Sequence, residues 1–239
     1  MATKGGNLPE LEPDHPCFDC SVRDLAVCGV LEADALRLFK EGGPSVQYDA
    51  GDTIVFESDL AANVYSLTSG LIRLSKLLAD GRRQIAGFLF PGDFLGITME
   101  DEHAFTAEAV APSTLCKFSR RQFDQIVSRQ PALERRLYAV AAHELAAARQ
   151  QLILVGRKTA TERISSFLLM LEGRCQCAQA GGDIAFPMSR ADIGDYLGLR
   201  IETVSREISA LKAARVIQLT GRQSFRILRR DTLEQLAEG

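Results

Sequence analysis

The sequence predicts an α+β fold: a roll of short β-strands, then one long helix, then a helical unit that ends in a β-hairpin. Three observations carry this prediction. Short apolar runs separated by turn residues fill residues 44–118, a helical repeat follows from residue 131, and two helical patterns joined at a glycine lie beyond residue 189. The chain has 239 residues and is 46% hydrophobic and 25% charged, which suits one large or two modest globular domains.

Composition narrows the possible functions. No run of about 18 apolar residues is present, so no helix is expected to span a membrane. The first 30 residues lack a charged segment followed by an apolar one, so no secretory signal is expected. We therefore expect a cytoplasmic protein without a membrane partner. Histidine is present only at His15, His103 and His143, which argues against a multi-histidine metal centre or a histidine-based catalytic triad.

Charge differs between the two parts of the chain, although the net charge is only −3. Residues 1–156 hold 15 lysines and arginines against 21 aspartates and glutamates, whereas residues 157–239 hold 13 against 10. The second part is therefore the candidate for contact with phosphate groups.

Residues 1–30 form a polar arm that carries three of the six cysteines, Cys17, Cys20 and Cys28. In a reducing compartment these thiols are not expected to form disulfides. Thiolates this close in sequence repel one another unless a cation neutralises them, and sets of soft thiolates favour zinc or an iron–sulfur cluster. Both centres usually take four ligands, so one more is expected from His15, Cys116, Cys175 or Cys177. The alternative is a mobile tail with three free cysteines.

The remaining three cysteines also have simpler interpretations. Residues 114–118 alternate as a strand does, so this pattern alone makes Cys116 a thiol in a core. Cys175 and Cys177 lie among glycines, which favours a pair in a loop over a set of ligands.

Residues 31–130 are expected to form the roll. Four apolar runs are each bounded by turn signals such as Ser69-Gly70; the runs are 53–56, 64–67, 71–74 and 88–90. Strands this short and evenly spaced favour a β-roll or jelly roll over a parallel sheet. Such rolls often hold a ligand or a metal, but the His and Glu ligands of a cupin-type metal site are missing.

Residues 131–156 are expected to form one helix, and Pro131 suits its first turn. Apolar residues then recur at spacings of 4, 4, 3, 4 and 3, as in a coiled-coil seam of about three heptads. A narrow seam rich in alanine favours two helices that pack closely across the axis of a homodimer. The alternative is a helix packed on its own roll. The expected interface residues are Leu137, Ala141, Leu145, Ala148, Leu152 and Val155.

Residues 157–239 carry the pattern of a winged helix-turn-helix. Ser189 is placed to cap a first helix, Gly194 is the small residue needed where a second helix crosses, and Gly198 suits a turn with positive φ. Apolar residues fill the seam between the helices: Ile193, Leu197, Leu199, Val204, Ile208 and Leu211.

The second of these helices has an exposed polar face. Glu202, Ser205 and Arg206 recur at helical spacing on the side opposite the apolar seam. Residues 216–228 follow with two short apolar runs that suit a hairpin wing. The alternative is a generic unit of two packed helices, which would not need this turn, seam and wing together.

With these parts in this order, the chain from Cys17 onward resembles the CRP/FNR family of transcription regulators. Ile193–Leu199 and Glu202–Arg206 are similar to the FNR subgroup in particular, and Pro91–Gly96 is similar to a turn of the family's sensor domain. The resemblance implies an N-terminal β-roll (jelly-roll-like) sensor domain, a long dimerisation helix and a C-terminal winged helix-turn-helix. It also implies a regulator that is not an enzyme, binds double-stranded DNA as a homodimer and contacts RNA polymerase through the hairpin at 80–84.

The FNR resemblance further implies a cofactor. Cys17, Cys20, Cys28 and Cys116 lie where that subgroup holds an oxygen-labile [4Fe–4S] cluster, although the gap before Cys28 is longer here than in the best-known members. Loss of the cluster in air would release the arm from the roll and end dimerisation and DNA binding. We expect this switch to control anaerobic gene expression. A regulator that binds zinc through the same four thiolates is the alternative.

The resemblance also implies how DNA is recognised. Arg206 would bind a guanine through O6 and N7, Glu202 would accept from a cytosine amine, and Ser205 would contact a thymine or an adenine. The expected binding sites are inverted repeats of TTGAT.

Two rival functions fit the sequence less well. A cyclic nucleotide needs an Arg-Ser or Arg-Thr pair to neutralise its phosphate, whereas residues 101–106 are acidic and lack arginine, so no cyclic nucleotide is expected. A thiol-dependent enzyme would need a Cys-x-x-Cys between a strand and a helix, a glycine-rich nucleotide loop or paired histidines, and the sequence has none of these.

Overall fold

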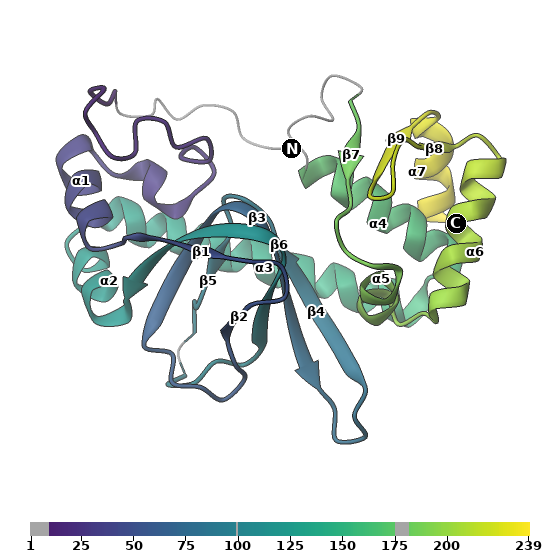
Figure 1. The fold of residues 1–239 in the computed structure, drawn as a ribbon, viewed down its shortest axis with the longest axis horizontal. Helices are drawn as coiled ribbons and strands as arrows, with labels where there is room; N and C mark the ends of the chain where they lie inside the picture. The colour runs from purple at the N-terminus through teal and green to yellow at the C-terminus, as the bar shows by residue number, and fades with distance from the viewer. Residues whose placement is uncertain (1–9, 99, 175–181) are drawn as a thin grey trace. The chain divides into compact units, whose positions relative to one another are not determined.

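The computed structural model describes residues 10–98, 100–174 and 182–239 (Figure 1). The chain divides into two compact units, the first made of Met1–Lys76 and Gly87–Leu145, the second of Leu77–Ala86 and Ala146–Gly239. The predicted α+β class is confirmed, with β-strands first, then a long helix and a C-terminal helix-turn-helix. Among the described residues, no helix has both the length and the apolar character needed to cross a membrane. Cys175 and Cys177 lie outside the described residues.

The N-terminal arm packs into the first unit. It contains a short 3-10 helix, η1 (Val27–Val30), and leads into α1 (Ala33–Glu41). Val22 and Val27 are almost fully buried, and Val27 shares an apolar core with Phe39 of α1. Because burial of apolar surface stabilises a contact, the packed arm is favoured over a mobile tail.

The roll contains six strands. They are β1 (Ser45–Tyr48), β2 (Thr53–Val55), β3 (Asn63–Leu77), β4 (Arg83–Leu89), β5 (Phe94–Leu95) and β6 (Thr106–Ser119). The sheet order is β1-β6-β3-β4, with β2 also paired to β6 and β5 to β3. The pairings of β6 with β1, β2 and β3 are antiparallel. Apolar side chains fill this sheet's own core, among them Leu67, Ile72 and Leu115.

One prediction about these strands is wrong. The runs 64–67 and 71–74 belong to a single strand, β3, which continues through Ser69 and Gly70. The pairing of β3 with β6 shifts register at this point. Gly70 has φ +98°, and a Cβ on it would lie 2.6 Å from the carbonyl oxygen of Pro112. A glycine bulge therefore bends the strand where the sequence suggested a turn.

Two helices follow the roll. α2 (Arg120–Val127) is capped by Ser119, whose hydroxyl accepts a backbone N–H of the first turn. α3 (Pro131–Arg157) begins at the expected proline. Leu133 of α3 is fully buried in the core that contains Phe39, so the long helix is anchored to the first unit at its N-terminal end.

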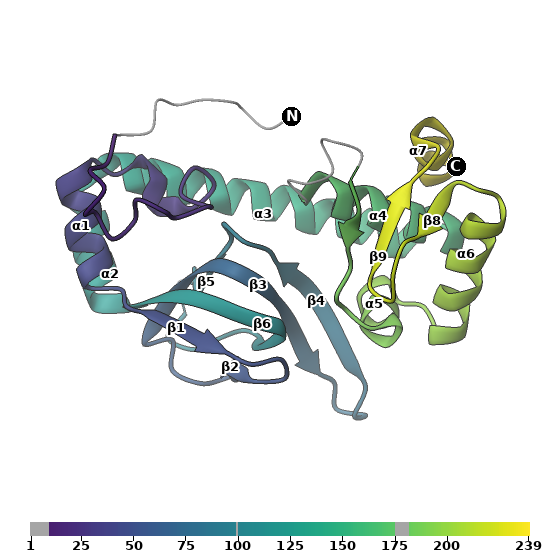
Figure 2. The same cartoon turned by 45° about the horizontal axis from the view of Figure 1, so that its top comes forward.

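The second unit contains the helix-turn-helix and its wing. Its elements are α4 (Ala160–Arg174), β7 (Ile184–Ala185), α5 (Arg190–Leu197), α6 (Ile201–Ala213), β8 (Ile217–Leu219), β9 (Ser224–Ile227) and α7 (Arg230–Glu238). α4 packs against α6 and α7, and α5 packs against α6 (Figure 2). The strands form a small sheet of order β7-β9-β8, which is the wing.

Candidate functional site

Four cysteines lie together beside one core of the first unit. Cys17 is a buried member of this core, and the half-buried Cys20, Cys28 and Cys116 pack against it. The thiols of Cys17, Cys20 and Cys116 all act electrostatically on that of Cys28. The structure thus brings together the four ligands that the family resemblance implied, three from the arm and one from β6.

Burial and mutual repulsion make two of these thiols difficult to ionise. Burial, followed by the neighbouring thiols, raises the pKa of Cys28 to about 12. Burial and Cys20 together raise the pKa of Cys17 to about 11. Because metal binding requires thiolates, a positively charged centre must compensate for the protons that are lost. A set of four sulfurs suits either zinc or an iron–sulfur cluster.

Zinc and an iron–sulfur cluster need different spacings of their sulfurs. Within residues 10–98, 100–174 and 182–239, no three His, Cys, Asp or Glu side chains converge closely enough to hold a single metal ion. A tetrahedral zinc ion with Zn–S bonds of about 2.3 Å needs its sulfurs only about 3.8 Å apart. A [4Fe–4S] cube is larger and takes sulfurs that are farther apart. Either centre would use the same four thiols, and metal analysis of the purified protein distinguishes them.

His15 holds the arm in place rather than pointing at the thiols. Its buried ring accepts the backbone N–H of Cys17 at Nδ1 over 3.0 Å, and Nε2 donates to the carbonyl of Ala33 over 3.1 Å. Both ring nitrogens are therefore engaged in fixing Cys17 to the start of α1. Among the alternatives for a fourth ligand, the structure places Cys116 with the arm cysteines and gives His15 a different role.

The loop between Cys20 and Cys28 closes on a glycine. The backbone N–H of Arg23 donates to the carbonyl of Cys20 at 3.3 Å, which starts the loop with a turn. A Cβ at Gly29 would lie 2.0 Å from the carbonyl oxygen of Arg23, a distance that no real side chain tolerates. Glycine at this position therefore lets the long gap fold back on itself. The sequence prediction missed Gly29, although a glycine directly after Cys28 is visible in the sequence.

Cys116 is presented by the sheet of the roll. In β6 it pairs with Ser45 of β1 and Ser66 of β3. Lys40, in the last turn of α1, donates from Nζ to its Sγ at 3.2 Å. The sequence prediction missed Lys40, because 76 residues separate it from Cys116 and a lone lysine forms no motif.

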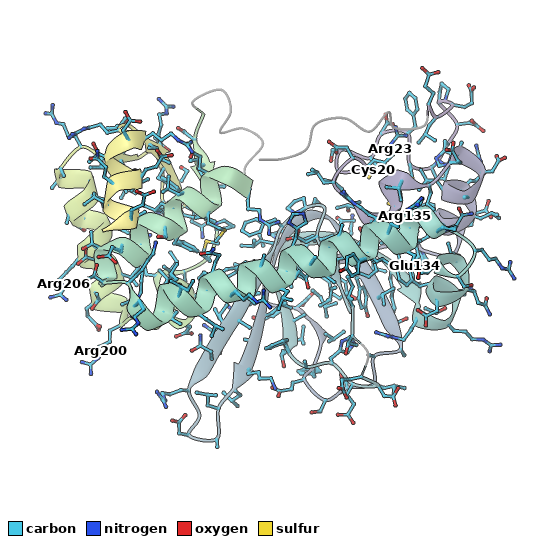
Figure 3. The ribbon with its side chains drawn as sticks, turned by 180° about the vertical axis from the view of Figure 1, so that it is seen from behind. Cys20, Arg23, Glu134, Arg135, Arg200 and Arg206 are labelled. Atoms are coloured by element: carbon cyan, nitrogen blue, oxygen red, sulfur yellow. The ribbon has the colours of Figure 1, made fainter. Side chains whose placement is uncertain are left out.

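The arm is also tied directly to α3. Arg136 donates to the carbonyl of Leu25 at 2.7 Å and to that of Asp24 at 3.4 Å, both in the loop that precedes Cys28. Figure 3 shows this part of the arm, with Cys20 labelled, beside the start of α3. The cysteine loop and the N-terminal end of the long helix therefore form one connected structure.

An apolar stripe lies exposed along α3. Tyr138, Leu145 and Leu152 are 78%, 53% and 70% exposed and recur every seven residues. Ala141 and Ala148 lie between them and are exposed as well. This spacing is that of a coiled-coil seam, and within the described residues nothing covers it.

The two ends of the predicted seam are less exposed than its middle. Leu137 packs against the core of the first unit, beside Val140. Val155 is half-buried, and its carbonyl accepts a hydrogen bond from Arg163 at 2.9 Å. The exposed stripe begins instead at Tyr138, which the sequence prediction missed although it lies seven residues before Leu145.

The helix-turn-helix has the turn that the sequence predicts. Ser189 forms a capping box with Asp192 at the start of α5. A Cβ at Gly194 would lie 2.6 Å from the carbonyl oxygen of Leu199, and Gly198 has φ +64°. Both glycines are needed for α6 to cross α5 closely. The seam residues are buried, apart from the half-buried Leu199: Ile193, Leu197, Val204, Ile208 and Leu211.

The exposed face of α6 carries the predicted base-reading residues. Glu202, Ser205 and Arg206 are all exposed, and Figure 3 shows Arg206 and Arg200 pointing away from the unit. Arg206 donates a long hydrogen bond to Thr203 Oγ1 at 3.4 Å. So weak a contact leaves the guanidinium able to turn toward an outside partner.

The hairpin at 80–84 uses its two arginines differently. Arg82 pairs with Asp80 at 2.7 Å on the exposed tip. Arg83 pairs with Asp192 and Asp195 at 2.7 and 2.8 Å, all within the second unit. Of the surface expected to contact RNA polymerase, Arg83 is half-buried, and the other residues are exposed: Asp80, Gly81, Arg82 and Gln84.

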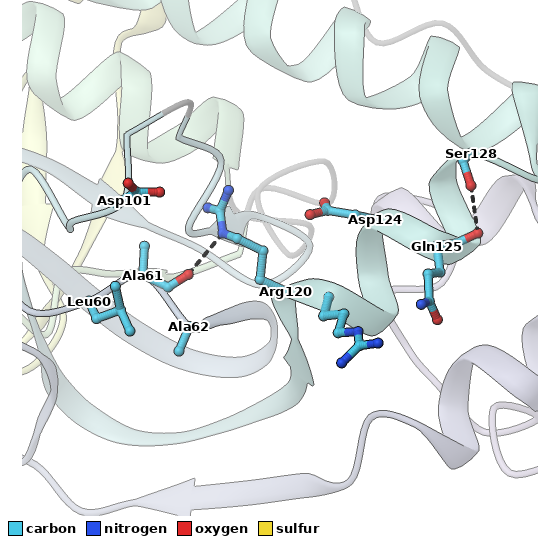
Figure 4. Close-up of a pocket in the computed structure, with 9 residues that line it drawn as sticks. Leu60, Ala61, Ala62, Asp101, Arg120, Asp124, Gln125 and Ser128 are labelled. Carbon is cyan, nitrogen blue, oxygen red and sulfur yellow. Dashed lines mark hydrogen bonds between the residues drawn. The ribbon is translucent and has the colours of Figure 1, made fainter.

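A pocket of about 690 Å³ lies beside α2 (Figure 4). Arg120 lines it and donates to the carbonyl oxygens of Ala61 at 2.8 Å, Thr98 at 2.8 Å and Gly96 at 2.6 Å. These contacts tie two loops of the roll to the start of α2. Arg120 therefore acts as a structural clamp between these loops and α2.

Comparisons with known protein families cover both parts of the chain. A model of the cyclic nucleotide-binding domain matches residues 45–130. A model of the Crp-like helix-turn-helix domain matches residues 162–236. The β-rich part and the C-terminal part therefore match domains in the order in which the structure contains them.

Individual relatives extend over most of the chain. The nitrogen fixation regulation protein FixK of Bradyrhizobium diazoefficiens is 43% identical over 84% of this chain and 86% of its own. The transcriptional activator protein FnrL of Cereibacter sphaeroides is 36% identical over 87% of this chain and 86% of its own. The structure of FixK2 from Bradyrhizobium japonicum matches with a TM-score of 0.77 at 37% identity, over 81% of this chain and 96% of that one. The chain belongs to the CRP/FNR family of transcription regulators, with relatives in its FNR subgroup.

Proposed function

We propose that this regulator senses oxygen through a [4Fe–4S] cluster held by Cys17, Cys20, Cys28 and Cys116. With the cluster bound, it forms a homodimer through α3 and binds TTGAT-type inverted repeats to control anaerobic gene expression. The observation that carries the proposal is that all four cysteines lie beside one core and that three of the thiols act electrostatically on that of Cys28. The cluster would supply a redox-active group that dioxygen can attack.

The relatives support the regulatory part of this proposal. FnrL of Cereibacter sphaeroides and Anr of Pseudomonas protegens are both named transcriptional activator proteins. Each matches 87% of this chain. A chain similar to them over this length is expected to activate transcription as well.

Residues of the chain itself would transmit the state of the arm to α3. Ligation by Cys116 would join the arm to β6. Arg136 of α3 donates to the backbone carbonyl of Leu25 and so holds the loop that precedes Cys28. Leu133 of α3 lies in the same core as Cys17. Loss of ligation would therefore free the arm and loosen the core beneath α3. The exposed stripe of α3 would then no longer be held in the position that pairs with a second copy.

Dimerisation would place two α6 helices against the same face of DNA. Two-fold helix-turn-helix dimers contact half-sites about 34–36 Å apart, which is one helical turn. Arg206 would donate two hydrogen bonds to a guanine, Glu202 would accept from a cytosine, and Ser205 would contact a thymine or an adenine. The excess of basic residues over 157–239 would add attraction to the phosphates.

Anaerobic reconstitution of single cysteine variants tests this ligand set. Changing Cys17, Cys20, Cys28 or Cys116 to serine is expected to abolish both cluster iron and operator binding, because three thiolates hold the cluster poorly. Cys175→Ser is the matched control and is expected to retain both, as is the same change at Cys177. Iron content and operator binding are measured on the same sample.

The same experiment separates the alternatives. A Cys116→Ser protein with full iron content and normal operator binding would exclude the four-ligand set. Wild-type protein that is colourless and contains zinc would establish a zinc-bound regulator in place of an oxygen sensor.

A further inference from the structure

Lys40 places a positive charge against one of the proposed cluster ligands. Its Nζ donates to Sγ of Cys116 at 3.2 Å, to Oγ of Ser45 at 2.8 Å and to the carbonyl of Gly43 at 3.2 Å. An ammonium has three N–H donors and no acceptor, so these three contacts use all of them. The ammonium is therefore fixed in position with one donor directed at the sulfur.

The other two groups that accept hydrogen bonds from Lys40 have no negative charge that would neutralise its ammonium. Ser45 and Gly43 offer a hydroxyl and a backbone carbonyl, and none of the ion pairs found among the described residues includes Lys40. The charge also reaches the arm. Burial raises the pKa of Cys17, and Lys40 opposes that rise. A single cation thus acts on one thiol from β6 and on another from the arm.

A cation in this position has a defined effect on a cluster bound by thiolates. Four thiolates bring excess negative charge to the site, and each added electron increases it. Hydrogen bonds to the ligand sulfurs and nearby charge set the reduction potential of an iron–sulfur cluster. A fixed ammonium at one sulfur stabilises the more negative, reduced state and offsets the repulsion among the ligands.

We propose that Lys40 is a positioning residue that fixes the Cys116 thiolate for the cluster and raises the cluster's reduction potential. The inference rests on the cluster proposed above. A lysine that merely joins α1 to β1 would contribute to folding stability and would leave the reduction potential unchanged.

Lys40→Met tests this role, because methionine keeps a similar stem and removes the charge. Lys117→Met is the matched control: it removes the same charge beside Cys116, from a side chain on the opposite face of β6. Anaerobic redox titration of the loaded proteins measures the midpoint potential, and competition with an iron chelator measures cluster retention. We expect Lys40→Met to lower the potential and to release iron roughly tenfold faster, the order expected when a hydrogen bond to a charged group is lost. Lys117→Met is expected to change neither.

Two further variants keep the test decisive. Lys40→Arg retains the charge and is expected to recover most of the wild-type potential. Lys40→Gln removes the charge but can still donate to Ser45, so it replaces the methionine variant if that protein does not fold. An unchanged potential and unchanged iron release in the neutral variants, with wild-type protein fully loaded, would overturn this inference alone. Wild-type protein that takes up no iron would overturn the proposed function together with it.

Discussion

His15 and Gly29 shape the arm without being proposed ligands themselves. His15 fixes Cys17 to the start of α1 through both ring nitrogens. Gly29 lets the chain after Cys28 pass against the carbonyl of Arg23, where any side chain would collide. The positions of the cysteines in the arm therefore depend on two residues that are not themselves proposed ligands.

Arg206→Ala is expected to weaken operator binding by roughly 1–3 kcal/mol and to relax specificity at one base pair, because a bidentate contact to guanine is lost. Competition among operators that differ at single positions measures both effects. Lys212→Ala, exposed near the end of the same helix, is the control and is expected to leave base preference unchanged. Equal weakening on every DNA sequence would show that Arg206 contacts phosphate alone.

Some site residues could be predicted from the sequence and others could not. The arm cysteines follow from their close spacing, whereas Cys116 needed the resemblance to a family, because a lone cysteine in a strand pattern is most simply a core residue. Lys40 and Arg136 were missed, since their contacts join residues 76 and 111 positions apart. Such contacts are set by the tertiary fold and leave no signal in the local sequence pattern.

The long helix α3 has two different faces. Leu133 and Leu137 contribute to the core of the first unit, while Tyr138, Leu145 and Leu152 form the exposed stripe. Large apolar side chains at a seven-residue spacing favour association with another helix of the same kind. The predicted homodimer would bury this stripe against its copy.

Leu145→Glu is expected to give a monomer that keeps its cluster and loses operator binding, because two like charges would face each other in the seam. Analytical ultracentrifugation, iron content and operator binding are measured together under anaerobic conditions. His143→Glu, exposed on the same helix but off the stripe, is expected to remain a dimer. A Leu145→Glu protein that sediments as a dimer and binds the operator would place the interface elsewhere.

Elements were predicted best where local signals were strong. The start of α3 at Pro131 and the turn at Gly198 follow from the conformations that these residue types favour. A seven-residue repeat does not show which of two adjacent residues faces the core. Leu137 was therefore predicted to lie in the dimer seam, whereas the exposed residue is Tyr138. Gly70 was interpreted as a turn because glycine serves turns and bulges alike, and only the pairing of β3 with β6 distinguishes them.

In the proposed function, the chemistry of the arm controls the association of two chains. Cys17 and Leu133 share one core, and Arg136 joins the arm to α3 by hydrogen bonds. These contacts give the state of the arm a physical path to the dimer helix. They would make dimerisation, and hence operator binding, depend on the cluster.

Arg136→Met is expected to keep the cluster but to reduce the difference in operator affinity between cluster-bound and cluster-free protein by roughly two- to tenfold. That range corresponds to the net value of a typical hydrogen bond. Operator titrations of the loaded and iron-free forms measure the difference. Arg135→Met, a neighbouring exposed arginine, is the control and should leave it unchanged. If both variants respond as wild type does, the arm acts on α3 through the shared core alone.

Wild-type protein purified without oxygen and then exposed to air tests the proposed oxygen switch. Iron content, visible absorption, sedimentation and binding to a TTGAT inverted repeat are followed on the same sample. The proposed switch predicts a brown dimer with about four iron atoms per chain that binds the operator, and parallel loss of colour, dimer and binding in air. Air-exposed protein that has lost its iron but still binds the operator as a dimer would contradict it.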